Sequence, residues 1–125
     1  MESRIIQRGA EAIILKEKNK INKKRIKKSY RIPELDKKIR KLRTRSETKL
    51  LIKASKIINT PQVHESDEKT KEIKMDFIKG ERLSEFLNNF QLKRQLKILL
   101  NIGKDIAKLH DAEIIHGDLT TSNMI

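Results

Sequence analysis

Apolar residues near the start of the chain come in short groups separated by residues typical of turns. Ile5-Ile6 and residues 12–15 lie on either side of Gly9, a pattern that predicts two short strands joined by a tight turn. A third strand is expected near residues 21–26, although its many lysines give it a low intrinsic strand propensity.

Two further strands are expected near the middle of the chain. One lies near Val63 and the other spans residues 73–78, on either side of a polar turn at residues 66–70. Gly80 ends the second of these strands, because glycine weakens a strand interior.

A long helix is predicted between the third and fourth strands. It begins at Pro33 and ends at Asn59-Thr60-Pro61. Steps of three or four residues connect one mostly apolar stripe, made of Leu35, Ile39, Leu42, Ser46, Leu50, Ala54 and Ile57. A neighbouring stripe on the same half of the helix contains Glu47, Leu51, Ala54 and Ile58.

Helical patterns dominate the last third of the chain, at residues 83–89 and 91–111. The buried face of the longer helix is predicted from its periodic apolar and small residues, which are Leu92, Leu96, Leu99, Leu100, Gly103, Ile106, Ala107 and His110. The whole pattern predicts an α+β fold, with an antiparallel sheet and one long helix followed by a helical segment.

The composition indicates a small apolar core and fits a reducing compartment. Hydrophobic residues make up 36% of the 125 positions and charged residues 38%. A run of about 20 apolar residues and the apolar core of a signal peptide are both missing, which argues against membrane association. Cysteine is absent, so disulfides and thiolate metal sites are excluded. We expect a cytoplasmic protein.

Positive charge is concentrated in one segment. Residues 16–56 hold 18 of the 30 Lys and Arg residues and only four acids, Glu17, Glu34, Asp36 and Glu47. The net charge of this segment is therefore +14, and that of the remainder is −1. Such a field attracts polyanions such as tRNA, although a heavily charged solvated face is an equally simple interpretation.

The strongest chemical motif lies at residues 114–123, Ile-Ile-His-Gly-Asp-Leu-Thr-Thr-Ser-Asn. It resembles the protein-kinase catalytic loop H-R-D-x-x-x-x-N, with the same five-residue step from Asp118 to Asn123. Asp118 would orient the hydroxyl of the phosphate acceptor, and Asn123 would hold a metal ion between phosphate oxygens. An ordinary polar turn capped by Asn123 is the simpler alternative.

With this motif, the order of elements matches a protein kinase. Residues 1–78 are then the small lobe, and residues 79–125 are the hinge and the start of the large lobe. In the turn at Gly9, Ala10 and Glu11, a single glycine would permit backbone approach to phosphate, although such a glycine is often only a turn residue.

A kinase also needs a strand lysine fixed by a helix glutamate. Glu47 is the expected glutamate, Lys23 the expected lysine and Lys24 the next choice, because strand alternation places Lys23 on the face of Ile21. Charge balancing is the plain alternative for Glu47.

The segment before Gly80 reads like a kinase hinge. Met75 would guard the back of the pocket, while the carbonyl of Asp76 and the N–H of Ile78 would bond adenine. A plain buried strand explains the same residues.

Four segments together resemble one kinase family, at residues 9–12, 23–36, 43–47 and 116–123. It is the small RIO-like kinase-ATPase subunit of the KEOPS (EKC) complex, the PRPK family. The most specific stretches are Tyr-Arg-Ile-Pro-Glu-Leu-Asp at residues 30–36 and the catalytic loop. The resemblance implies that Lys23 and Glu47 anchor the phosphates of ATP, that Asp118 is catalytic and that Asn123 binds Mg²⁺.

The resemblance also implies a biological setting. The family's complex makes the threonylcarbamoyl modification of adenosine in tRNA, and its kinase subunit hydrolyses ATP and can phosphorylate Ser or Thr. The implied partners are the metal-dependent threonylcarbamoyltransferase subunit and a small subunit that docks on the small lobe.

The chain departs from the family pattern because no Asp-Phe-Gly segment occurs before Ile125. Its aspartate would hold the main Mg²⁺ ion, so we expect the 125 residues to be a fragment with crippled phosphoryl transfer. Gly117 replaces the arginine that reads a phosphorylated activation loop, which predicts that such control is missing.

Two other functions stay open at this point. One is a small-molecule kinase of the aminoglycoside or choline type, which can carry the same His-Gly-Asp loop. The other is a non-catalytic module that binds tRNA or an acidic protein through residues 16–56.

Overall fold

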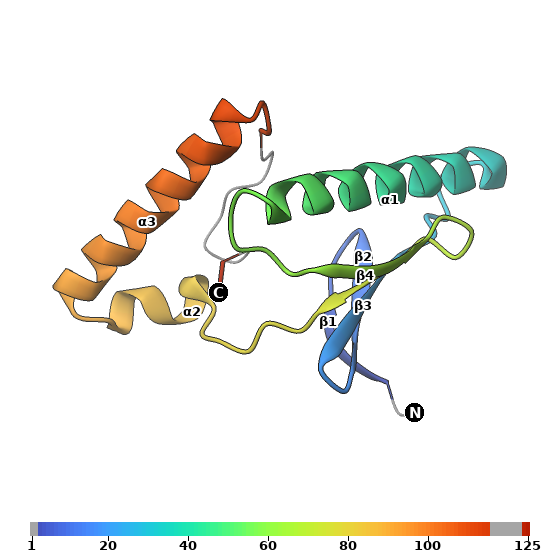
Figure 1. Ribbon diagram of the computed structural model, residues 1–125. Coiled ribbons are helices and arrows are strands. Elements are labelled where there is room, and N and C mark those ends of the chain that lie inside the picture. The colour runs from blue at the N-terminus through green and yellow to red at the C-terminus, as the bar shows by residue number, and fades with distance from the viewer. Residues whose placement is uncertain (1–2, 116–123) are drawn as a thin grey trace. The chain divides into compact units, whose positions relative to one another are not determined.

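The chain forms two compact units in the computed structural model, which describes residues 3–115 and 124–125. The first unit comprises Met1–Ser55 and Thr60–Phe77, and the second comprises Lys56–Asn59 and Ile78–Ile125. Figure 1 shows the helices and strands of each.

A five-stranded sheet with the order β1-β2-β3-β5-β4 forms most of the first unit. All neighbouring strands are antiparallel. The strands are β1 (Arg4–Arg8), β2 (Ala12–Glu17), β3 (Lys20–Arg25), β4 (Val63–Asp67) and β5 (Glu72–Asp76). The predicted α+β fold with an antiparallel sheet is therefore confirmed.

The long helix α1 (Pro33–Ser55) packs on β4 and β5, and it lies along the sheet in Figure 1. It ends four residues before the predicted stop at Asn59. Its first turn carries Glu34 and Asp36, acids that interact favourably with the positive end of the helix dipole.

The face of α1 that packs on the sheet is the more polar one. Leu35, Leu42 and Leu50 of the predicted apolar stripe are 46–49% exposed. The buried residues of the helix are Asp36, Thr44 and Ala54. Thr44 is satisfied by donating its hydroxyl hydrogen to the carbonyl of Arg40 at 2.7 Å. The buried face of the helix thus includes Ala54 of the neighbouring stripe, and Glu47 of that stripe pairs with Lys23 and Arg25 of β3.

The apolar core of the first unit is small. Ile73 and Met75 from β5 are 2% and 6% exposed, and Ala12 and Ala54 are also buried. The β3–β5 register places Ile73 opposite Lys23 and Met75 opposite Ile21. The core thus lies directly beside the charged residues of β3.

The second unit contains α2 (Leu83–Phe86), a 3-10 turn η1 (Leu87–Asn89) and α3 (Leu92–Asp111). Leu83, Leu109 and Ile114 are its buried apolar residues. The predicted buried face of α3 is wrong: Gly103, Ala107 and His110 are exposed, and the buried residue is Leu109, which was not predicted. Four leucines of that face are 50–68% exposed: Leu92, Leu96, Leu99 and Leu100.

Candidate active site

The first unit brings together two oppositely charged residues that lie far apart in the sequence. Lys23 on β3 and Glu47 on α1 are separated by 24 positions, yet Nζ lies 2.7 Å from Oε1. Their side chains are 29% and 22% exposed, so the pair is partly shielded from water. This shielding makes the attraction stronger than that of a surface pair.

Strand alternation explains why Lys23 is the residue that reaches α1. Ile21, Lys23 and Arg25 alternate along β3 and are half-buried, whereas on the other face Lys20 and Lys24 are exposed and Asn22 is buried. Lys24 lies 3.6 Å from Glu72 of β5 instead. The sequence could therefore separate Lys23 from Lys24 by the two-residue period of a strand.

A second cation occupies the other oxygen of Glu47. Arg25 Nη2 lies 2.9 Å from Oε2, and the Arg25 side chain is only 14% exposed. The sequence analysis missed this residue, although the same alternation that selected Lys23 places Arg25 beside it. Two cations on one carboxylate give the cluster a net charge of +1, which suits an anionic ligand.

The turn between β1 and β2 is held in place from several directions. The Gly9 N–H donates to the carbonyl of Ala12 at 2.9 Å, and the Ile26 N–H donates to the carbonyl of Glu11 at 3.0 Å. The Lys28 ammonium donates to the carbonyl of Ala10. Arg43 of α1 pairs with the Glu11 carboxylate at 3.2 Å. The turn is thus tied both to the segment after β3 and to α1.

Gly9 is not required by the shape of its own turn. Its φ is outside the left-handed region, and a Cβ built on it would meet only the carbonyl oxygen of Ala12, at an ordinary 3.5 Å. A glycine that the backbone does not need leaves room for another group to approach. The turn therefore leaves open space beside its main chain at Gly9.

Asp36, the last residue of the Tyr-Arg-Ile-Pro-Glu-Leu-Asp stretch, anchors the start of α1. Its carboxylate is fully buried and accepts from the Lys28 N–H at 3.0 Å and from Arg40 Nε at 2.7 Å, with Arg31 at 3.5 Å. Burial by itself raises the pKa of Asp36. The hydrogen bonds from Lys28 and Arg40 and the charges of Arg40 and Arg31 outweigh it, so the pKa is lowered. The carboxylate stays charged and fixes the entry into α1.

The predicted hinge residues are placed as follows. Met75 is buried in the sheet. Asp76 ends β5, and its carboxylate bonds with His64 and accepts from the Gln62 N–H at 3.1 Å. These two hydrogen bonds, that of His64 first, lower the pKa of Asp76. Ile78 begins the second unit and is 41% exposed.

Two predicted residues, Asp118 and Asn123, lie outside the described residues. Within residues 3–115 and 124–125, no three His, Cys, Asp or Glu side chains gather closely enough to hold a metal ion. None of the helices in those ranges is long and apolar enough to cross a membrane.

Comparison with solved structures identifies the fold. The co-crystal structure of WbdD and a kinase inhibitor matches 93% of this chain with a TM-score of 0.62 and 18% sequence identity. The match covers 28% of the WbdD chain. The predicted protein-kinase-like fold is thereby confirmed.

Comparison with curated sequences gives closer relatives. KEOPS complex subunit Bud32 of Pyrococcus abyssi is 47% identical over 98% of this chain. EKC/KEOPS complex subunit BUD32 of Enterocytozoon bieneusi is 39% identical over 97%. A probable bifunctional tRNA threonylcarbamoyladenosine biosynthesis protein of Methanobrevibacter smithii is 44% identical over 97%.

The chain spans only part of each of these relatives. It covers 60% of the Pyrococcus protein, 64% of the Enterocytozoon protein and 22% of the Methanobrevibacter protein. No protein-family model matches the chain. Over nearly all of its own length, however, the chain is homologous to KEOPS Bud32 subunits, and the resemblance predicted from its sequence is confirmed.

Proposed function

We propose that the protein is an ATP-binding kinase-ATPase subunit of a KEOPS-type complex that supports threonylcarbamoyladenosine modification of tRNA. The observation that carries this proposal is the 2.7 Å ion pair between Lys23 and Glu47 in a kinase-like fold. A strand lysine fixed by a helix glutamate is how kinases hold the α- and β-phosphates. The names of the relatives supply the setting in tRNA modification.

Each predicted residue takes a definite role in this proposal. Lys23 donates to phosphate oxygens, Glu47 fixes the direction of Lys23, and the turn at residues 9–11 lies along the phosphates. Met75, Asp76 and Ile78 face the adenine. When bound, ATP supplies the phosphoryl group, and Mg²⁺ neutralises charge on the phosphates.

The residues of the catalytic loop complete the assignment. Asp118 orients the attacking hydroxyl or water and accepts its proton, and Asn123 contributes an oxygen ligand to Mg²⁺. The partners are other KEOPS components, namely the metal-dependent transferase subunit and the small subunit that docks on the small lobe. The protein then acts in the cytoplasm.

A pair of lysine variants on adjacent positions tests the proposal. Lys23→Met should reduce ATP hydrolysis by roughly 100-fold and weaken binding of Mg²⁺-ATP, because the main donor to the phosphates is lost. Lys24→Met removes the same charge from the opposite face of β3 and should change both quantities less than about twofold. If titration shows that the two variants lose ATP affinity equally, the assignment of Lys23 to the phosphates is refuted.

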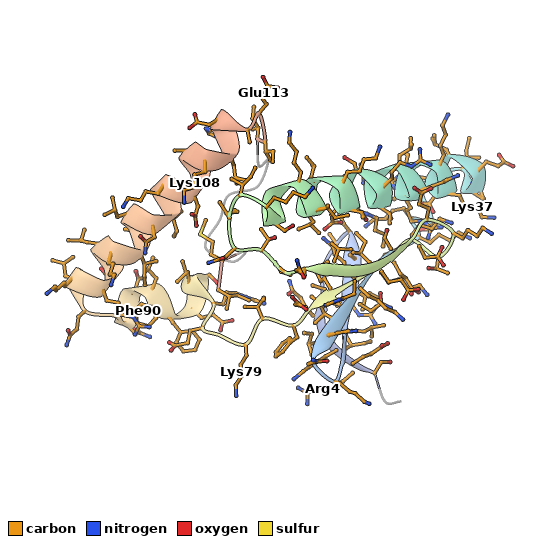
Figure 2. The ribbon with its side chains drawn as sticks, in the orientation of Figure 1. Arg4, Lys37, Lys79, Phe90, Lys108 and Glu113 are labelled. Atoms are coloured by element: carbon orange, nitrogen blue, oxygen red, sulfur yellow. The ribbon has the colours of Figure 1, made fainter. Side chains whose placement is uncertain are left out.

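A second function, binding of tRNA, is favoured by the charge pattern on α1. Five cations recur at every fourth position: Lys37, Lys41, Arg45, Lys49 and Lys53. All five are exposed, and Figure 2 shows Lys37 near the start of the helix. Arg45 pairs with Glu68 at 2.7 Å. We call this set the cation ladder.

The cation ladder is unfavourable for the helix itself. Like charges four residues apart cost about 0.2–0.5 kcal/mol per pair, and the ladder contains four such pairs. Glu68 offsets part of this cost, because it pairs with Arg45 and also attracts Lys41 and Lys49. Its cations are spaced by about 6 Å along the helix axis, since each residue rises about 1.5 Å. A repeated cost of this kind is offset when a polyanion binds along the helix.

Salt dependence distinguishes this function from a solvated charged face. The double variant Lys37→Gln/Lys41→Gln should weaken tRNA binding and lower the slope of log affinity against log salt by about 1–2. Lys79→Gln/Lys93→Gln, which removes two exposed lysines outside α1, serves as a control for net charge. If the slope of log affinity against log salt is unchanged in the lysine variant, the cation ladder does not contact tRNA. The ATP proposal would not be affected by that result.

A further inference from the structure

Arg25 is the most unusual member of the charged cluster. The paired lysine and glutamate already satisfy the requirement of a kinase, yet a second cation lies on the same carboxylate. Arg25 contacts Oε2 of Glu47 at 2.9 Å while Lys23 contacts Oε1 at 2.7 Å. Each oxygen of Glu47 therefore has its own cation.

The backbone fixes Arg25 more firmly than a surface arginine. It is the last residue of β3 and lies opposite Ala12 in the β2–β3 register. Its N–H donates to the carbonyl of Lys71 at 3.1 Å. The small side chain of Ala12, itself buried, leaves space for the guanidinium on this face.

The side chains of Lys23 and Arg25 differ in conformational flexibility. The Lys23 ammonium sits on a flexible stem and is 29% exposed, whereas the Arg25 side chain is 14% exposed and carries a rigid planar fork. If Lys23 turns toward a ligand, Glu47 keeps its contact with Arg25. Without Arg25, the same movement would leave Glu47 with no cation from β3.

We propose that Arg25 is a positioning residue that holds the Glu47 carboxylate in place, so that Glu47 directs Lys23 toward the phosphates. This inference rests on the proposed function, because it assigns a role within the same site. The positive charge that remains after pairing, +1, is available to the phosphates.

Zero-length crosslinking tests the proposal without using catalysis. A carbodiimide joins the Lys23 amine to the Glu47 carboxylate where they are in contact, and mass spectrometry of the peptides measures the yield in nucleotide-free protein. Arg25→Gln should lower the yield by about threefold or more, because Glu47 then samples other rotamers. A higher yield would mean that Arg25 competes with Lys23 for Glu47. A higher or an unchanged yield overturns the proposal.

Kinetics provide the second measurement. Arg25→Gln should lower kcat for ATP hydrolysis by about tenfold while the affinity for ATP changes less than about threefold, since Lys23 is misdirected rather than lost. Arg25→Lys keeps a cation without the planar fork and should lie between Arg25→Gln and the unmodified protein. Lys24→Met is the matched control on the opposite face of β3, with no change in crosslink yield or kcat.

The outcomes separate this inference from the function on which it rests. If Lys23→Met leaves ATP affinity unchanged, the proposed function fails. If Lys23→Met weakens ATP binding but Arg25→Gln keeps the original kcat and crosslink yield, only the role of Arg25 fails. Circular dichroism of Arg25→Gln and Arg25→Lys measures the fraction of unfolded protein. If kcat falls only in proportion to that fraction, the role of Arg25 is also overturned.

Discussion

Helices α1 and α3 have similar lengths and both expose leucines, but they differ in the residues that they bury. In α1, the buried residues include the charged Asp36 and the polar Thr44, while Leu35, Leu42 and Leu50 are exposed. In α3, the leucines of the first half are exposed and the one buried residue is Leu109. The polar face of α1 also carries Glu47, whose ion pairs with Lys23 and Arg25 of β3 form the candidate site.

The difference between the two helices shows that polar groups can be buried for function at the cost of stability. A buried charge must be fully paired, and replacing such a pair with apolar residues is often neutral or stabilising. The polar face of α1 nevertheless holds Glu47 beside Lys23 and Arg25. We therefore expect substitutions on this face to have larger effects than substitutions of the exposed leucines.

The largest loss of stability is expected for Asp36→Ala. This change leaves Arg31, Arg40 and the Lys28 N–H without their buried acceptor. The midpoint of thermal unfolding, followed by circular dichroism, should fall by roughly 10 °C or more. Glu34→Ala, which changes an exposed acid in the same turn of the helix, is the control. A similar small shift in both variants would show that the buried network does not hold α1.

Removing apolar contacts between the sheet and α1 should lower the stability of the first unit somewhat less. Ile73, at 2% exposure, is the most buried apolar residue of the first unit among the described residues. Ile73→Ala should lower the free energy of unfolding by about 2–5 kcal/mol, because it creates a cavity in a small core. Urea titration measures this change. A cost below that of Leu42→Ala on the exposed stripe would contradict the assigned orientation of α1.

Acid should weaken the first unit through three carboxylates. The pKa of Asp36 is lowered as described, that of Glu68 is lowered first by its hydrogen bond with Arg45, and that of Asp76 is lowered first by His64. Because these groups bind protons more weakly when folded, their stabilisation is complete above about pH 5 and is lost as the pH falls below about 4. Unfolding midpoints measured from pH 3 to 7 should show this decline. Arg45→Met should reduce it, and an unchanged pH profile in Arg45→Met would exclude the contribution of Glu68.

The smallest effect is expected on α3 and is stabilising. A Cβ at Gly103 would have no atom within 4 Å in the described structure, and glycine is about 0.5–1 kcal/mol worse than alanine in a helix interior. Gly103→Ala should therefore raise the free energy of unfolding by about that amount. Destabilisation in the same urea titration would mean that this face of α3 packs closely against another part of the protein.

The sequence predicted the strands and helices well because their signals are local. Gly9, Pro33 and the two-residue alternation around Lys23 located the first hairpin, the long helix and the lysine that faces it. The buried face of α1 was not predicted, because helical periodicity emphasises Leu35 and Leu42, while Asp36 is buried by its contacts with Arg40 and with the segment before the helix. Arg25 was missed for a related reason, since a kinase motif requires one cation and the pattern of a lysine-rich strand offers several.

The central claim is that Lys23, held by Glu47 and Arg25, binds nucleotide phosphates. The most direct test is a crystal structure of the protein with Mg²⁺ and a non-hydrolysable ATP analogue. We expect phosphate oxygens within hydrogen-bonding distance of Lys23 Nζ, with Glu47 still in contact with Arg25. Phosphates bound at Lys24 or along the cation ladder, with Lys23 free of the nucleotide, would contradict the account.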